Sequence, residues 1–347
     1  MDITEIQLTD GIRQLYVPKL NDITKFSPKG TRNWLANSGN FVPVSGCQKD
    51  YFELTLYDIN EFLACWAGDI VRMTCAFVET VTEITESQKN KKFLAWQMVQ
   101  YYYSAFYAAH ATLKVCGFGL IQLDKQIVRN IVNRAHTLGI SRDDNIANGI
   151  YCVNIDVLAS KIIFYRVSKY DDSHRGLWKR YTDFIDVLRG SAVVSGQFDS
   201  NCIKSRNPSE DHPLSVYSQL PIADAQIIID RIEAIRHTID KRGDSNWLSW
   251  VRNLVNYNHA FGIWYPYTEY QSKYDGLLSM KNLYQNNSLC SMLRYDDEEV
   301  ELSEFVKCCQ IINAINYEII MDLSKRNSEN KSFLLSGPLK FINLHKQ

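Results

Sequence analysis

Residues 101–111 are Tyr-Tyr-Tyr-Ser-Ala-Phe-Tyr-Ala-Ala-His-Ala, within an apolar segment that extends from Phe93 to Cys116. The segment combines large aromatic side chains with very small ones. The small residues allow a second helix to approach closely, and the aromatic rings fill the space beside the contact. This pattern predicts a long packed helix over residues 93–116, which Gly117 and Gly119 would end.

The segments around this helix are also expected to be mostly helical. From Asp58 onward, apolar residues recur at the i, i+3, i+4 spacing of a helix with one buried face. Further helices are expected over residues 124–138, 174–188, 223–241, 246–261 and 303–325, with a short one at 277–283. Ser303 is the expected N-cap of the last long helix.

Strand-forming residues are concentrated in one later part of the chain. Residues 151–167 are rich in Ile, Val, Tyr and Phe and predict one or two strands, and residues 51–57 alternate weakly. We therefore expect a mainly α protein with a small β-containing insertion. Its parts would be an N-terminal mixed segment at 1–55, a helical core from 56–140 and 220–330, an insertion at 141–219 with short strands and a loop over 190–221, and a tail at 331–347. Irregular structure is expected from residue 326 onward.

Composition limits the classes of function. The 347 residues are 46% apolar with a net charge of −1, so the chain is folded and any nucleic-acid site must be a local patch. The nine cysteines form no CxxC pair, which argues against a zinc ribbon and fits a reducing compartment. The N-terminus lacks a signal-peptide pattern and no apolar run approaches about 20 residues. We expect a cytoplasmic protein that makes no membrane contact.

Common catalytic motifs are missing from the sequence. It contains no GxxxxGK[ST] phosphate loop, no HExxH and no GxSxG. These absences argue against the usual NTPases, zinc proteases and esterases.

Residues 251–263 are Val-Arg-Asn-Leu-Val-Asn-Tyr-Asn-His-Ala-Phe-Gly-Ile and carry the main candidate site. In a helix, Arg252, Asn256 and His259 would project from one face. A guanidinium binds phosphate, and an imidazole can transfer a proton near neutral pH. The alternative is structural: Arg252 would cap a carbonyl or pair with an acid, and His259 would hydrogen-bond near the helix end.

A second segment repeats this pattern. Residues 128–140 are identical to residues 251–263 at eight of thirteen positions, including Arg129 and His136. The match does not extend beyond this window, so it indicates no duplicated domain. Either the match is a coincidence between two amphipathic helices, or Arg129 and His136 supply a second half of the site.

The aromatic helix followed by Arg-Asn-x5-His resembles the HEPN superfamily, over about residues 93–118 and 247–265. The resemblance implies a small α-helical bundle, often dimeric. Many members are metal-independent ribonucleases of toxin–antitoxin and anti-phage systems. Their motif is an Arg and a His separated by four to six residues, often with a polar residue directly after the Arg, and Arg252, Asn253 and His259 match it at its longer end.

The resemblance also implies a mechanism and partners. His259 would act as general acid or base in the attack of the RNA 2′-hydroxyl, and Arg252 would bind the scissile phosphate. Asn253 or Asn256 would orient the histidine or the phosphate. Products would be a 2′,3′-cyclic phosphate and a 5′-hydroxyl, formed without metal or cofactor. Expected partners are RNA, a second copy of the chain, and an antitoxin or defence-complex protein.

A competing hypothesis of another class keeps the fold and removes the catalysis. The chain would be a non-catalytic HEPN-like module that binds a partner protein or a nucleotide within a multi-protein defence complex. The near-neutral net charge favours this alternative.

Overall fold

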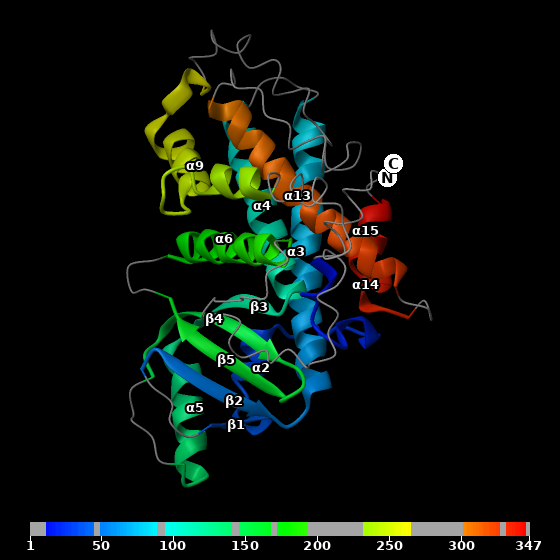
Figure 1. Ribbon diagram of the computed structural model, residues 1–347, viewed down its shortest axis with the longest axis vertical. Coiled ribbons are helices and arrows are strands. Elements are labelled where there is room, and N and C mark those ends of the chain that lie inside the picture. Colours follow the sequence, from blue (N-terminus) through cyan, green and yellow to red (C-terminus); the bar gives the residue numbers. More distant parts are fainter. Residues whose placement is uncertain are drawn as a thin grey trace.

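The computed structural model describes residues 12–44, 49–88, 94–140, 146–167, 172–192, 232–264, 301–326 and 331–344. The described chain is mainly helical, as expected, and contains a five-stranded antiparallel sheet. Figure 1 shows the sheet at one end of the long axis and a group of packed helices at the other. Among the described helices, none combines the length and apolar character needed to cross a membrane.

Helix α4 (Leu94–Val115) is the central element of the helical part, and the sequence prediction for it is confirmed. It packs against α3 (Ile59–Gln88) and α13 (Glu301–Lys325). It also contacts α6 (Ser173–Ala192) and α9 (Trp247–Asn258). Residues 94–115 and 247–258, although distant in sequence, thus lie on two helices in contact.

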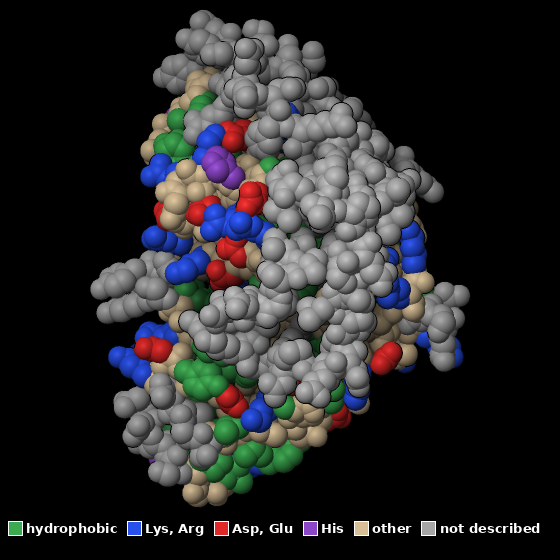
Figure 2. Space-filling model, in the orientation of Figure 1, with side chains coloured by type: hydrophobic (Ala, Val, Ile, Leu, Met, Phe, Trp, Pro, Cys, Tyr) green, Lys and Arg blue, Asp and Glu red, His purple; other side chains and the backbone are tan. Residues whose placement is uncertain are grey.

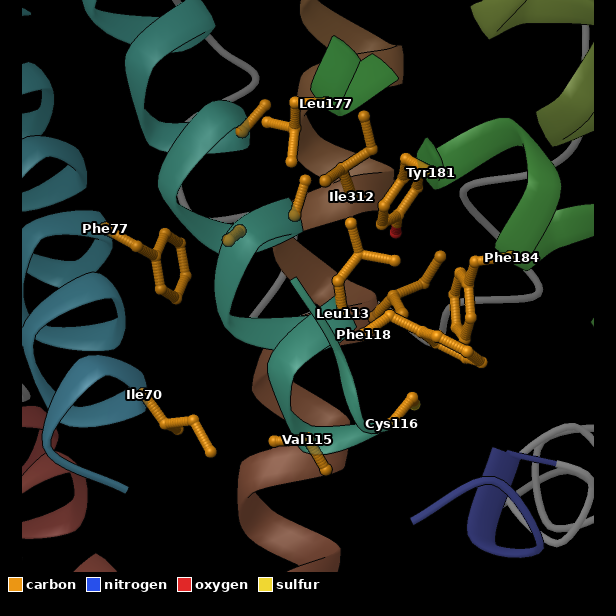
Figure 3. Packing of buried hydrophobic residues seen from close by; sticks show 14 of the residues in the cluster. Ile70, Phe77, Leu113, Val115, Cys116, Phe118, Leu177, Tyr181, Phe184 and Ile312 are labelled. Atoms are coloured by element: carbon orange, nitrogen blue, oxygen red, sulfur yellow. The ribbon is translucent and has the colours of Figure 1, made fainter. Parts of the chain in front are cut away.

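The composition of α4 explains this packing. Ala105, Ala108 and Ala109 are fully buried, so neighbouring backbones can approach this helix closely. Figure 3 shows larger side chains filling the space beside it, including Leu113 of the same helix and Ile312 of α13. Each such buried aliphatic side chain contributes roughly 1.5–3 kcal/mol to folding.

Small polar residues on α4 fix its contact with α13. Asn313 donates to the hydroxyl of Ser104 at 3.0 Å, and Asn316 donates to that of Thr112 at 3.3 Å. All four side chains are buried. Because a displaced pair would leave amide groups without partners, these bonds favour one register between the two helices.

The sheet is ordered β1-β2-β5-β4-β3, with antiparallel pairing throughout. Its strands are β1 (Phe41–Pro43), β2 (Tyr51–Leu56), β3 (Phe118–Leu123), β4 (Gly149–Asp156) and β5 (Lys161–Arg166). The strands expected within 151–167 and 51–57 are confirmed. The sheet is not confined to an insertion at 141–219, however, because β1 and β2 come from the N-terminal part and β3 directly follows α4.

Gly119 shows why β3 was missed. The sequence suggested that this glycine helps to end the helix, but Gly117, with φ of 79°, ends it alone. Gly119 lies inside β3, where a Cβ atom would be 2.8 Å from the indole of Trp66 on α3. The glycine is needed for this close approach of strand and helix, which cannot be recognised from local sequence.

The remaining described helices are short. They are α2 (Thr31–Leu35), α5 (Lys125–Thr137), α14 (Phe333–Ser336) and α15 (Pro338–Leu344), with 3-10 turns η1 (Leu20–Asp22), η2 (Ser38–Asn40) and η3 (Ala260–Gly262). Residues 232–239 are also helical. Helix α5 agrees with its prediction, because Asp124 caps its N-terminus and Gly139, with φ of 65°, follows its end.

Two expectations near the C-terminus are wrong. Helix α13 begins at Glu301, so Ser303 lies inside the helix rather than at its N-cap. The expected irregular tail instead contains α14 and α15, because Phe333, Leu334 and Ile342 are buried in the core. Residues 190–192 belong to α6, while the rest of the expected 190–221 loop and the 277–283 helix lie outside the described residues.

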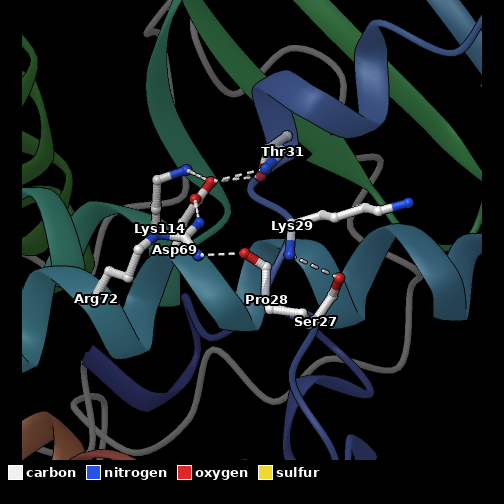
Figure 4. Close-up of polar contacts among 7 residues, drawn as sticks. All are labelled: Ser27, Pro28, Lys29, Thr31, Asp69, Arg72 and Lys114. Atoms are coloured by element: carbon white, nitrogen blue, oxygen red, sulfur yellow. Dashed lines mark hydrogen bonds and ion pairs between the residues drawn. The ribbon is translucent and has the colours of Figure 1, made fainter.

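A buried ion pair joins α3 to the end of α4 (Figure 4). Lys114 is 3% exposed, its Nζ lies 3.0 Å from Asp69 Oδ2, and it stands 3.8 Å from the Trp66 ring centroid. Thr31 and Arg72 also donate to this carboxylate. Burial raises the pKa of Asp69, but Lys114 and the other donors outweigh it and lower the pKa to about 2.

We predict that Asp69→Asn strongly destabilises the fold, because it leaves the Lys114 ammonium buried without a counter-charge. The expected loss is about 3 kcal/mol in the free energy of unfolding, measured by urea titration. Arg32→Gln is the control: it removes the exposed ion pair between Arg32 and Asp124 and should cost less than about 1 kcal/mol. Equal losses in the two variants would contradict this account.

Candidate functional site

Arg252 belongs to the buried face of α9. Apart from Ser249, the neighbouring residues of that face are apolar, and Arg252 is only 8% exposed. Its guanidinium carbon lies 4.8 Å from the ring centroid of Tyr102 and 5.9 Å from that of Tyr103, both on α4. Nη1 donates a long hydrogen bond of 3.4 Å to the Tyr103 hydroxyl. The cation is therefore held by aromatic rings.

Within the described part of the chain, Arg252 pairs with no carboxylate, and its Nε has no acceptor. A buried charge without a counter-ion costs several kcal/mol, of which a desolvated cation–π contact offsets about 2 kcal/mol. Among the described residues, Arg252 makes neither the carbonyl cap nor the ion pair that the structural alternative expected of it. An uncompensated, ring-supported guanidinium is suited to binding an anion.

His174, the second residue of α6, packs against the same two tyrosines, Tyr102 and Tyr103, as this cation. Its Nδ1 is 2.8 Å from the Tyr102 hydroxyl, and its ring centroid is 4.6 Å from that of Phe106. The side chain is half-buried, so the cluster reaches the surface here. Burial lowers the pKa of His174, and the charge of Arg252 lowers it further. The imidazole is therefore neutral at physiological pH and able to accept a proton.

Tyr102 joins the three helices at this point. Its hydroxyl lies 3.1 Å from Trp178 Nε1 on α6 and 3.0 Å from Ser249 Oγ on α9, in addition to its contact with His174. Burial raises its pKa to about 12, so the phenol keeps its proton. We call Arg252, His174, Tyr102 and Ser249 the α4–α6–α9 cluster.

His259 does not share a helical face with Arg252, and that expectation is wrong. Helix α9 ends at Asn258, and His259 adopts the left-handed conformation with φ of 51° while its N–H donates to the Leu254 carbonyl. The exposed imidazole stacks on Trp264, with ring centroids 5.6 Å apart. The sequence placed the helix stop at Gly262, but the chain turns three residues earlier.

The two asparagines of the motif do not join the cluster. Asn253 is exposed and Asn256 is half-buried on α9. Neither makes a hydrogen bond to Arg252 or to His174. Their roles as orienting groups stay predictions.

Arg129 and His136 lie on α5, beside the sheet, and both are exposed. Figure 1 places α5 and α9 at opposite ends of the long axis, so the two similar segments do not face each other within one chain. Their local structures differ too, because His136 is inside its helix and His259 is outside. The similarity of the two segments is therefore one of sequence pattern.

Sequence reasoning missed His174. It stands at the start of a helix that was correctly expected, with no motif around it. Its only signal is its position in the first turn of that helix. Its partners Tyr102 and Arg252 are more than seventy residues away in either direction, and packing alone brings them together.

Charge on the described surface around α6 and α9 is mixed. Figure 2 shows Lys and Arg side chains interspersed with Asp and Glu over these helices, so this face carries no continuous basic surface. Within the described ranges, no three His, Cys, Asp or Glu side chains gather as a metal site would require. The local positive charge at the cluster comes from Arg252.

No protein-family model, no curated protein and no solved structure compared with this chain matches it.

We predict that Arg252→Gln raises the pKa of His174, because the substitution removes a nearby positive charge that disfavours the imidazolium. The measurement is an NMR titration of the His174 ring carbons. Arg242→Gln is the matched control, since Arg242 also lies over an aromatic ring, that of Trp250, but is exposed at the surface. A His174 pKa that is unchanged in Arg252→Gln would show that the two groups are not electrostatically coupled.

Proposed function

We propose that this chain is a metal-independent endoribonuclease of HEPN type, acting in prokaryotic anti-phage defence or in a toxin–antitoxin system. The proposal replaces His259 by His174 as the residue that transfers protons. One observation carries it: the buried guanidinium of Arg252 pairs with no carboxylate among the described residues, and it shares the partner Tyr102 with a half-buried imidazole whose pKa is lowered. A phosphodiester would supply the missing negative charge.

The chemistry follows from these two side chains. The His174 imidazole takes the proton from the RNA 2′-hydroxyl as the 2′-oxygen forms its bond to phosphorus. The bond from phosphorus to the 5′-oxygen breaks, and that oxygen takes a proton from solvent water as it leaves. The His174 imidazolium then returns its proton to solvent, so the neutral imidazole is restored. Arg252 binds the phosphate and stabilises the charge that develops on it. The products are a 2′,3′-cyclic phosphate and a 5′-hydroxyl.

The arrangement of the helices supports the HEPN assignment. The segments that carry the resemblance, about residues 93–118 and 247–265, lie largely on α4 and α9, and these two helices pack together. Helices α3 and α13 complete the surroundings of α4. The distance between the two segments in sequence is therefore compatible with a single helical bundle that also carries a sheet.

A non-catalytic module that binds a nucleotide or a partner protein is the second candidate. It is favoured by the mixed charge on the face of α6 and α9, since a ribonuclease would gain affinity for long RNA from a basic surface. Such a module would use Arg252 to bind a phosphate without cleaving it. The two candidates differ in whether His174 is needed for a reaction.

The test is incubation of the purified chain with mixed-sequence single-stranded RNA in EDTA. We expect His174→Ala to lower kcat by about 10²-fold or more, and Arg252→Lys to lower kcat/KM by a similar factor. His259→Ala is the matched control and should cleave like the wild type. Because His174 must be neutral to act as a base, kcat/KM should rise with pH and level off below the ordinary histidine pKa of 6.5.

Each other outcome has a definite meaning. Loss of cleavage in His259→Ala with full activity in His174→Ala would restore the site inferred from the sequence and reject ours. RNA binding that needs Arg252, with no cleavage by the folded wild type, would favour the binding module. Cleavage that is lost on chelation would reject the metal-free mechanism.

Homodimerisation and an antitoxin or defence-complex partner are part of the same proposal. The exposed Arg129 and His136 are not needed by the α4–α6–α9 cluster. Sedimentation of the purified chain, alone and with RNA, tests whether two copies associate. A monomer with full cleavage activity would remove the dimer from the proposal.

A further inference from the structure

The hydroxyl of Tyr102 makes three contacts at hydrogen-bond distance, to Trp178 Nε1, Ser249 Oγ and His174 Nδ1. A phenol has one proton to donate and accepts through its oxygen lone pairs. The indole N–H can only donate, so it occupies one acceptor position. Of the other two partners, at most one can receive the Tyr102 proton, and the other must donate to Tyr102.

Two arrangements satisfy this count. In the first, Tyr102 donates to His174 Nδ1 and receives the Ser249 proton, so a neutral imidazole carries its proton on Nε2. In the second, His174 donates from Nδ1 to Tyr102, and Tyr102 donates to Ser249, so a neutral imidazole has a free lone pair on Nε2. Only the second can persist when the imidazole is protonated, because both ring nitrogens then carry protons.

We propose that Tyr102 is the positioning residue for His174, an inference that rests on the proposed ribonuclease function. The Tyr102 oxygen accepts a hydrogen bond from His174 Nδ1–H, and the Tyr102 hydroxyl donates to Ser249. The neutral imidazole then has its lone pair on Nε2, the nitrogen that takes the substrate proton. Nδ1 is already occupied by Tyr102, so Nε2 is the nitrogen left to take a proton from a substrate. The arrangement remains the same before and after that transfer. No hydroxyl has to turn during the reaction, which is the benefit of a preorganised site.

The surroundings hold Tyr102 in this role. The residue is fully buried, its ring supports the Arg252 guanidinium, and its hydroxyl is tied to α6 and α9. One residue thus orients the base through its oxygen and the phosphate-binding cation through its ring. The charged and titratable groups that act on His174 or lie against it are the following: Arg252, Asp172, Tyr102, Tyr103 and His110.

The first measurement requires no RNA. The NMR shifts of the His174 ring nitrogens and carbons report which nitrogen carries the proton in the neutral imidazole. We expect the Nδ1–H form in the wild type and a shift toward the Nε2–H form in Tyr102→Phe. The same variant should lower the pKa of His174 further, because the imidazolium loses an acceptor. An Nε2–H imidazole in the wild type would overturn the inference.

The second measurement uses cleavage. Tyr102→Phe keeps the ring beneath Arg252 and removes only the hydroxyl, so kcat should fall by about tenfold or more while KM stays unchanged. Ser249→Ala should lower kcat in the same direction and serves if Tyr102→Phe does not fold. Tyr107→Phe is the matched control on α4, since it changes a half-buried tyrosine that makes no contact with His174.

The NMR measurement and the cleavage measurement together distinguish a failure of the inference from a failure of the proposed function on which it rests. Full kcat in both Tyr102→Phe and Ser249→Ala, with His174→Ala inactive, overturns the role of Tyr102 and leaves the ribonuclease proposal intact. Absence of RNA cleavage by the wild type removes the ribonuclease proposal. The Nδ1–H form and its loss in Tyr102→Phe would still establish that Tyr102 sets the proton position of His174.

Discussion

The close packing of α4 against four other helices is the constraint on which the rest of the structure depends. Buried alanines allow its neighbours to approach, while the Ser104 and Thr112 hydroxyls fix the register of α13. Three aromatic residues of α4, Tyr102, Tyr103 and Phe106, lie against residues of α6 and α9. Two polar groups, the Arg252 guanidinium and the His174 imidazole, are brought against these rings and lose much of their hydration. The chemical character of the cluster follows from that loss of water, because burial lowers the pKa of the imidazole and removes hydration from a cation that pairs with no carboxylate in the described part of the chain.

The helical framework could be predicted from sequence because its signals are local. The apolar spacing after Asp58, the aromatic–alanine mixture of α4 and the glycine after α5 all depend on neighbours within a few turns. The sheet could be predicted only in part, since the existence of β3 depends on Trp66 of a distant helix packing over Gly119. The C-terminal helices were missed for a similar reason: Phe333 and Leu334 become helical where the core buries them, and no repeating pattern marks so short a segment.

The candidate site shows the same division. Arg252 could be identified from sequence, but His259 is not its partner on a helical face, because α9 ends at Asn258 and His259 itself adopts the left-handed conformation. The assumption that a helix continues to the next glycine failed at a histidine that adopts a positive φ. The imidazole that does lie beside the guanidinium comes from α6, and Tyr102 links the two. Such a group can be recognised only when the contacts between helices are known. A single sequence does not contain that information.

The central claim is that Arg252 and His174 form one anion-binding unit, and the Arg252 Nε–H resonance tests it most directly. The probe is a single-stranded DNA oligonucleotide, which carries the phosphodiester but lacks the 2′-hydroxyl needed for cleavage. On titration, the Arg252 Nε–H signal and the His174 ring signals should shift together and saturate at the same oligonucleotide concentration. Binding of the oligonucleotide with both sets of signals unchanged would place the anion elsewhere and contradict the account.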